Sequence, residues 1–227
     1  FMPASTPSIK VDAVRSLGGT AKLIGQSFDD AKAAAFEFAQ EHSLSFVHPF
    51  DDMDVIAGQG TVGMELLRQL DGNVDAVFVC VGGGGLIAGV SAYVKTLLPD
   101  TMVIGVEPDD SPTLHQALLA GEPVDLEHVG LFADGASVKR IGDNTFKIAK
   151  ENVDEVCLVD TDEICAAIKD MFEETRTVLE PAGALALAGA KKWLKRKNWS
   201  GKRVVAITSG ANMNFDRLRF VAERAEV

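Results

Sequence analysis

The stretch 81–90, VGGGGLIAGV, places four consecutive glycines between two apolar segments. The residues before it, DAVFVC at 75–80, have the composition of a short buried β-strand, and those after it, LIAGVSAYVKTLL at 86–98, repeat apolar residues with helical spacing. A turn from strand to helix usually needs only one or two glycines for positive φ. Four in a row indicate a backbone that must approach something closely, with no side chains in between.

A glycine loop of this kind is suited to holding a phosphate group. The backbone N–H groups of Gly82, Gly83, Gly84, Gly85 and Leu86 can converge on phosphate oxygens, and the N-terminus of the following helix adds partial positive charge. Side chains at these positions would hold the phosphate away. The alternative is a tight turn without a ligand, which needs glycine only for its backbone conformation.

Dinucleotide binding is a competing hypothesis. Gly83, Gly85 and Ala88 satisfy G-x-G-x-x-A, and Glu107 ends a predicted strand about twenty residues later, as the NAD fingerprint requires. That fingerprint usually lies in the first strand–helix–strand unit, whereas several units precede the loop here. The sequence has no GxxxxGK[ST] motif, so it gives no support for a nucleoside triphosphatase.

The composition is that of an ordinary globular protein. The 227 residues are 47% hydrophobic and 24% charged, which is enough for one large domain or two modest ones. A net charge of −11 argues against nucleic acid or an anionic membrane as a partner. Apolar runs stay below the roughly 18 residues that a membrane span needs, and the sequence shows no signal peptide.

The cysteines and histidines show no metal-site spacing. Each cysteine lies in an apolar segment without a CxxC motif, which predicts buried thiols in a reducing compartment. The histidines are scattered, which predicts surface or packing roles. These residues are Cys80, Cys157, Cys165, His42, His48, His115 and His128.

Strand-like and helix-like segments alternate along the chain, which predicts an α/β fold with a mostly parallel sheet. Ser27 is expected to cap a helix with Asp30 in a capping box, Thr161 to cap another, and Pro181 to begin a third with Glu180 outside it. The segment 109–143 is expected to be looser. Helices are expected at 7–17, 27–42, 55–70, 86–98, 161–179 and 181–196, and strands at 21–25, 44–50, 75–80, 101–108, 154–160 and in the first half of 202–215.

Several motifs occur in an order that resembles one enzyme family. They are VIAGQGTVGMELLRQL (55–70), VGGGGLIAGV (81–90), GVEP (105–108), FADG (132–135), LEPAGALALAG (179–189) and TSGANMNF (208–215). Together they resemble the pyridoxal-phosphate (PLP) enzymes of the tryptophan-synthase-β type, also called fold type II. Within these, the likeness is to biosynthetic threonine deaminases (threonine ammonia-lyases), and it covers essentially the whole chain.

The resemblance implies a set of cofactor-binding residues. Residues 82–86 would hold the PLP phosphate through backbone N–H groups, and Ser209 would form a hydrogen bond with the pyridine nitrogen. Gly135 would line the cofactor ring, and Glu180 would lie near the pyridine edge. Without the resemblance, Ser209 and Gly135 are interpreted as turn residues and Glu180 as an acid that precedes a helix.

A cation site is implied only in outline. Glu107 corresponds to a carboxylate that helps to ligate a cation in some relatives, which makes it the one candidate metal ligand. Ser111 and Thr113 supply no second carboxylate. The ligand set is therefore undefined.

The implied reaction is the PLP-dependent β-elimination of L-threonine to 2-oxobutanoate and ammonia, a step of isoleucine biosynthesis. In the family, the Schiff-base lysine lies in a motif like SFKxRGA and the substrate carboxylate is gripped by a loop like S-x-G-N-H; neither motif appears here. We interpret Lys10, Lys22, Lys32 and Lys95 as solvated surface residues and nominate no catalytic residue. FMPASTP at 1–7 is therefore expected to follow a missing upstream segment, and the chain alone is expected to be inactive.

The resemblance also implies a domain division, with residues 1–47 as the remainder of the small domain and 48–227 as most of the large PLP-binding domain. It implies an amino-acid substrate (threonine or also serine), a homo-oligomer, and a cytoplasmic enzyme, or a plastid or mitochondrial one in a eukaryote.

Two alternative functions stay open. One is a serine/threonine dehydratase or serine racemase relative, and the other is a non-catalytic phosphate- or NAD-binding module that uses Gly83, Gly85 and Glu107.

Overall fold

A parallel β-sheet forms the centre of the protein in a computed structural model, which describes residues 1–71 and 73–226. Its strand order is β3-β2-β1-β4, and each neighbouring pair is parallel. The predicted α/β fold with a mostly parallel sheet is confirmed. The strands are β1 (Ala76–Cys80), β2 (Met102–Pro108), β3 (Glu155–Val159) and β4 (Val204–Ala206).

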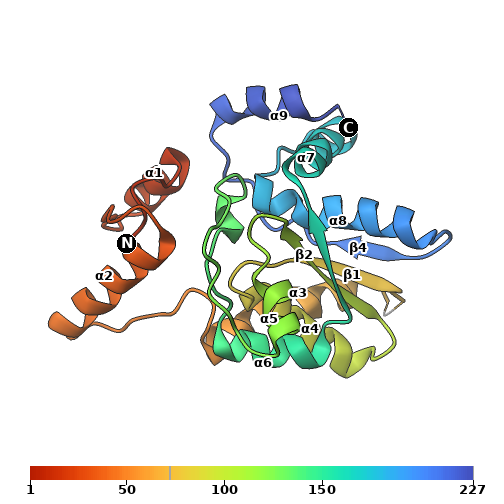
Figure 1. Ribbon diagram of the computed structural model, residues 1–227, viewed down its shortest axis with the longest axis horizontal. Helices are drawn as coiled ribbons and strands as arrows, with labels where there is room; N and C mark the ends of the chain where they lie inside the picture. The colour runs from red at the N-terminus through yellow and green to blue at the C-terminus, as the bar shows by residue number, and fades with distance from the viewer. Residues whose placement is uncertain (72, 227) are drawn as a thin grey trace.

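Helices cover both faces of the sheet (Figure 1). Successive strand residues point to opposite faces, so Phe78 packs in the core on one face of the sheet, whereas Val77 and Val79 pack in the core on the other face. The buried strands are therefore apolar on both sides, as expected of a parallel sheet. One layer holds α7 (Thr161–Thr175), α8 (Pro181–Lys197) and α9 (Leu218–Arg224), and the other holds α3 (Met53–Gln69), α4 (Gly85–Leu97), α5 (Thr113–Ala120) and α6 (Asp143–Asn152).

Small residues in α8 allow a close approach between backbones. A Cβ added to Gly183 would lie 2.1 Å from the carbonyl oxygen of Gly210, in the turn after β4. Only glycine at 183 permits this contact. It places Glu180, the N-cap residue of α8, beside the turn that carries Ser209.

The first 47 residues stand apart from the layered body in Figure 1, joined to it by an extended connection. They contain α1 (Ser8–Ser16) and α2 (Phe28–Glu41). The predicted capping box is present: the Ser27 hydroxyl accepts from the Asp30 N–H, and the Asp30 carboxylate accepts from the Ser27 N–H. Only Val11, Ala31 and Ala39 are buried among these residues.

Two predicted strands in this region are wrong. Residues 21–25 form only an isolated bridge between Met2 and Leu23, and residues 44–48 are irregular. A strand is stable only when a neighbour completes its hydrogen bonds, and neither segment finds one along its length. Leu44 and Val47 of the second segment are exposed, so burial does not support a strand there either.

The predictions for 109–179 were partly wrong. Helices α5 and α6 were not anticipated, nor was the short 3₁₀ turn η1 (Asp134–Ala136). Helix α7 is capped by Asp160 rather than Thr161, because the Asp160 carboxylate accepts from the Glu163 N–H at 2.8 Å and the Glu163 carboxylate accepts from the Asp160 N–H at 2.9 Å. The helix also ends at Thr175, since Arg176 takes a left-handed conformation.

Two further expectations concern burial and membranes. Cys157 and Cys165 are buried as predicted, while Cys80 is only partly buried. Within the described ranges, no helix is both long and apolar enough to cross a membrane.

Candidate functional site

The topology of the sheet selects one edge for a ligand. The chain passes from β1 through α4 to β2 on one side of β1, whereas β4 lies on its other side. In open parallel sheets, ligands bind outside the carboxyl ends of the strands where the strand order reverses. At this point the Cys80 Sγ lies 3.2 Å from the Ser209 Oγ. The glycine loop and the Ser209 turn therefore meet at the edge that is most suited to a ligand.

The glycine loop joins β1 to the first turn of α4. Gly84 is the N-cap of α4 and has φ +90°, a conformation that strongly favours glycine. A Cβ on Gly83 would lie 2.3 Å from the Phe50 ring, and one on Gly82 would lie 2.9 Å from the Cα of Ala136. Neighbouring segments thus provide a packing reason for these glycines, independent of any ligand.

The orientation of the loop leaves donors available. Across residues 1–71 and 73–226, no backbone carbonyl accepts a hydrogen bond from the N–H of Gly83, Gly84 or Gly85. The N-cap residue supplies no side-chain cap either. Unpaired N–H groups at a helix N-terminus attract anions, because the helix dipole adds partial positive charge there. The loop has the donors that a phosphate group requires.

A cavity of about 370 Å³ opens over the loop. Its walls come from the glycine loop, the end of β1, the η1 region, the connection before α3 and the start of α2. The predicted residues Gly82, Gly83, Gly84, Gly85, Leu86 and Gly135 all line it, together with Phe28, Pro49, Phe50, Gln59, Cys80, Asp134, Ser137 and Val138. The cavity therefore lies between the first 47 residues and the layered body.

Glu180 lies just outside the lining of this cavity, next to Gly135. A Cβ on Gly135 would lie 3.7 Å from the Glu180 Oε1, and one on Gly210 would lie 2.1 Å from the same atom. The Oε2 atom is buried and accepts no hydrogen bond within the described part of the chain, although the Lys10 Nζ lies 3.1 Å away. The Lys10 ammonium is therefore the ion-pair partner of this buried oxygen. The two remaining predicted residues, Glu180 and Ser209, thus adjoin the cavity that the other six line.

The interpretation of Lys10 as a solvated residue is wrong. Its ammonium lies 2.8 Å from the Asp134 Oδ2 as well as 3.1 Å from Glu180. Burial acts to lower the pKa of Lys10, but the hydrogen bond with Asp134 and the charges of both carboxylates outweigh it and raise the pKa above 10.5. Lys95 is also largely covered and pairs with Asp154 at 2.8 Å.

Glu107 has a different role from those that the sequence indicated. Its side chain is fully buried at the end of β2 and caps α5: Oε1 accepts from the Leu114 N–H at 2.7 Å, and Oε2 accepts from the His115 N–H at 2.9 Å. Burial raises its pKa to about 7, opposed by these hydrogen bonds. A carboxylate so enclosed cannot reach a ribose, which removes the acidic residue of the dinucleotide hypothesis.

The candidate metal role of Glu107 also loses its support. Both oxygens already accept hydrogen bonds, and no group of three or more His, Cys, Asp and Glu side chains within residues 1–71 and 73–226 is arranged to hold a metal ion. Among the histidines, His48 closes a turn, because its Nδ1 accepts from the Asp51 N–H at 2.8 Å. Burial lowers the pKa of His48, which suits a neutral acceptor.

Sequence reasoning missed several residues around the loop. Phe50 packs on Gly83, and the buried hydroxyls of Thr113 and Thr145 donate to the carbonyls of Gly82 and Gly83, at 2.7 and 2.8 Å. These contacts join residues that are 31 and 62 positions apart in the sequence. No local pattern marks them.

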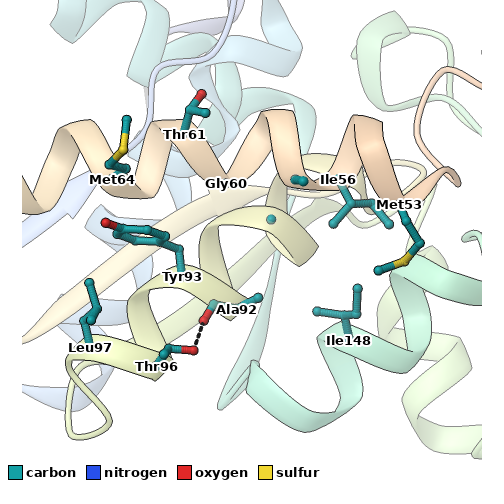
Figure 2. Close-up of a pocket in the computed structure, with 12 residues that line it drawn as sticks. Met53, Ile56, Gly60, Thr61, Met64, Ala92, Tyr93, Thr96, Leu97 and Ile148 are labelled. Atoms are coloured by element: carbon teal, nitrogen blue, oxygen red, sulfur yellow. Dashed lines mark hydrogen bonds between the residues drawn. The ribbon is translucent and has the colours of Figure 1, made fainter.

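A larger cavity, of about 530 Å³, lies between α3, α4 and α6, away from the glycine loop (Figure 2). Met53, Met64, Leu97 and Ile148 surround it, and none of its lining residues has a carboxylate, imidazole or amine group. The hydroxyl of Thr96 is already used, since it donates to the Ala92 carbonyl at 2.7 Å. The Thr61 hydroxyl likewise donates to the Gly58 carbonyl, so within the described part of the chain the Tyr93 phenol is the one polar side chain of this lining without such a bond.

Comparisons with known proteins agree with the geometry. Residues 1–210 match a family model described as pyridoxal-phosphate dependent enzyme. The whole chain aligns at 57% identity with the biosynthetic L-threonine dehydratase of Burkholderia multivorans and covers 45% of that protein. The processed form of threonine deaminase isoform 2 from Solanum lycopersicum has a TM-score of 0.94 at 46% identity, over all of this chain and 66% of that one. A serine racemase from Dictyostelium discoideum has a TM-score of 0.80 at 35% identity, over 94% of this chain and 68% of that one.

The chain spans less than half the length of the curated dehydratase that it matches. The family assignment does not depend on that length, because the family model covers 210 of the 227 residues and includes the glycine loop, Gly135, Glu180 and Ser209. This chain belongs to the family of pyridoxal-phosphate dependent enzymes.

Proposed function

We propose that this chain is part of the catalytic domain of a threonine ammonia-lyase, which converts L-threonine to 2-oxobutanoate and ammonia with PLP in isoleucine biosynthesis. One observation carries the proposal: free N–H groups of the glycine loop share the switch point of the sheet with the Ser209 hydroxyl. The likeness to threonine dehydratases supports the choice of substrate.

The residues around the cavity fit the cofactor. The N–H groups of 82–86 would hold its phosphate, and the Ser209 hydroxyl would form a hydrogen bond with its pyridine nitrogen. Gly135 would leave room for the ring, and Glu180 would lie near the ring edge. One feature calls for a polar ligand, namely the unpaired N–H groups of the loop.

When bound, PLP supplies an electron sink that lets a substrate lose its α-proton and then a β-substituent. The serine at position 209 moderates that sink, because a hydroxyl forms a hydrogen bond without the negative charge that would stabilise a protonated ring nitrogen. Phe28 and Phe50, whose ring centroids lie 5.8 Å apart, form an apolar wall that excludes water from this side of the cavity. The chain thus contributes binding, orientation and shielding.

The reaction also needs a neutral lysine amine, and Lys10 does not provide one. Asp134 and Glu180 hold it as an ammonium ion, and an ammonium ion is no nucleophile. We assign the lysine to a segment of the SFKxRGA type, a motif that these 227 residues do not contain. We therefore expect no turnover from these residues alone.

The domain division and the assembly belong to the same proposal. Residues 1–47 would be the remainder of the small domain and 48–227 most of the large domain, with the cofactor between them. The protein would act on a free amino acid as a homo-oligomer, in the cytoplasm or, in a eukaryote, in a plastid or mitochondrion. The net charge of −11 supports the exclusion of nucleic acid as a partner.

The test is to combine the chain with an upstream segment that carries the lysine motif and to supply PLP. Release of 2-oxobutanoate from L-threonine, faster than pyruvate from L-serine, supports the proposal. Preferential pyruvate release or racemisation of serine would favour the alternative of a serine dehydratase or serine racemase. The likeness to a serine racemase is the reason to test for it. Tight binding of NAD with no binding of PLP would reject the enzyme assignment.

A further inference from the structure

Two buried threonines hold the carbonyl groups of the glycine loop. The Thr113 Oγ1 lies 2.7 Å from the Gly82 carbonyl oxygen, and the Thr145 Oγ1 lies 2.8 Å from that of Gly83. Both threonines are 0% exposed, so no water competes for these hydroxyls. They come from the first turns of α5 and α6, which are separate in sequence from the loop and from each other.

The loop needs such restraint from outside. Glycine has more backbone freedom than any other residue, so four in a row do not fix their own peptide planes. In a trans peptide, the carbonyl of one residue and the N–H of the next point in opposite directions. The Gly82 carbonyl therefore sets the direction of the Gly83 N–H, and the Gly83 carbonyl sets that of the Gly84 N–H.

The two tethers differ in strength. The Gly83 carbonyl accepts from both the Thr145 hydroxyl and the Gly142 N–H, the latter at 3.2 Å. Thr113 is the one donor to the Gly82 carbonyl among the hydrogen bonds of the described residues. Thr113 is itself held in place, because Glu107 accepts from the N–H groups of the two residues that follow it in α5, at 2.7 and 2.9 Å.

We propose that Thr113 and, more weakly, Thr145 are positioning residues of the phosphate site. Their hydroxyls fix the peptide planes of Gly82 and Gly83, and this turns the N–H groups of Gly83 and Gly84 toward a bound phosphate. Glu107 supports the stronger tether by holding the N-terminus of α5 against the loop. The inference rests on the proposed PLP function, since it assumes that the loop binds the cofactor phosphate.

Thr101 offers a matched control within the same chain. It is a threonine that is only 4% exposed and whose hydroxyl donates to a backbone carbonyl, that of Val74, at 2.7 Å. It precedes β2 and so lies at the opposite edge of the sheet from the glycine loop. Thr101→Val removes a hydrogen bond of the same type without touching the loop.

The experiment measures binding to the 227-residue chain by calorimetry. Pyridoxine 5′-phosphate is the probe because it lacks the aldehyde and does not react with lysines, and pyridoxine without phosphate is the comparison. We expect Thr113→Val to weaken binding of the phosphorylated probe about tenfold and Thr145→Val about threefold, the size of one hydrogen bond. Thr113→Ser, which keeps the hydroxyl, should restore binding to within about twofold of wild type.

The phosphorus-31 chemical shift of the bound probe gives a second readout that loss of stability alone would not move. It should change in Thr113→Val and stay at the wild-type value in Thr101→Val. Unchanged binding in Thr113→Val, or equal weakening in Thr101→Val, would overturn the positioning roles while leaving the phosphate site intact. If the wild-type chain binds pyridoxine as tightly as its phosphate ester, the phosphate site itself fails, and the positioning roles fail with it.

Discussion

The layered body and the first 47 residues are stabilised to very different degrees. The body has two apolar cores, one on each face of the sheet, with side chains as large as Phe78, Ile104 and Leu185 fully buried. The first 47 residues bury only one valine and two alanines. Because stabilisation scales roughly with the apolar area removed from water, the two regions should unfold at different free energies. The glycine loop belongs entirely to the stable region, so the phosphate end of the site does not depend on the weaker one.

The largest expected effect comes from a cavity in the core of the body. Phe78 is fully buried on β1 and packs edge-on against Trp193, with ring centroids 5.7 Å apart. Phe78→Ala should lower the free energy of unfolding by about 3–5 kcal/mol. Urea titration followed by tryptophan fluorescence measures it, since both tryptophans, 193 and 199, lie in the body.

Val11→Ala is the counterpart in the weaker region. Val11 is the one buried residue of α1. Its truncation should speed amide hydrogen exchange in the first 47 residues and leave the urea midpoint of the tryptophan signal unchanged. Equal shifts of that midpoint in both variants would show that the two regions unfold as one unit.

The second prediction concerns the pH dependence of the stability of the body. Burial raises the pKa of Glu107 to about 7 from an ordinary value of 4.5. The folded protein thus binds this proton more tightly than the unfolded chain does. The contribution to stability is complete below pH about 4.5 and is lost as the pH rises through about 7, in total about 3 kcal/mol.

Glu107→Gln removes the titrating group and should remove this part of the pH dependence. Urea midpoints of the tryptophan signal, compared between pH 5 and pH 7.5, give the measurement. The wild-type free energy of unfolding should fall more over this interval than that of the variant. Parallel pH profiles for the two proteins would contradict the raised pKa.

Glu107 also shows where prediction from the sequence ends. Local patterns predicted what depends on adjacent residues, such as the capping box of Ser27, the start of α8 at Pro181 and the apolar strands of the sheet. The partners of Glu107 are also near in sequence, but a helix N-terminus that lacks a cap of its own has no local signal, so α5 was missed. An acid after an apolar strand was then interpreted as a ligand for a ribose or a cation.

The candidate site was predictable to the extent that it rests on motifs. The eight predicted cofactor residues line or adjoin one cavity, although their roles toward PLP remain proposals. The supporting contacts were not predictable, because they depend on how distant segments meet. Lys10 lies 124 positions from Asp134, and only the folded structure shows that the two form an ion pair.

The third prediction tests the contact between the two regions. Lys10 on α1 pairs with Asp134 and Glu180 of the body, and these side chains are mostly covered. Lys10→Met should leave Glu180 without its cation and Asp134 with only Arg217, 3.7 Å away, and weaken the docking of residues 1–47 by about 1–2 kcal/mol. Faster cleavage within the connection 43–52 would show the weaker docking. Thermolysin is a suitable protease because, unlike trypsin, it does not cleave after lysine.

Lys22→Met is the control for this change. The Lys22 ammonium lies 3.5 Å from the centroid of the Phe38 ring, within the first 47 residues, so its loss removes a lysine without touching the junction. Cleavage of the connection should then stay close to the wild-type rate. If Lys22→Met accelerates cleavage as much as Lys10→Met does, the ion pairs of Lys10 do not hold the two regions together.

The smallest expected effect provides the closest comparison, because each region has a helix with the same capping box. Ser27 caps α2 and Asp160 caps α7, each through the N–H of the third helical residue. Loss of either cap should destabilise its helix by about 1 kcal/mol. Asp160→Ala should lower the urea midpoint of the tryptophan signal, whereas Ser27→Ala should change only hydrogen exchange in α2. Both changes remove the acceptor of one N–H at a helix N-terminus, although Asp160→Ala also removes a charge, so the comparison depends on which signal responds in each variant and not on the size of the response. A shift of the tryptophan midpoint in Ser27→Ala would therefore reject separate stabilities, because Ser27 and the two tryptophans lie in different regions.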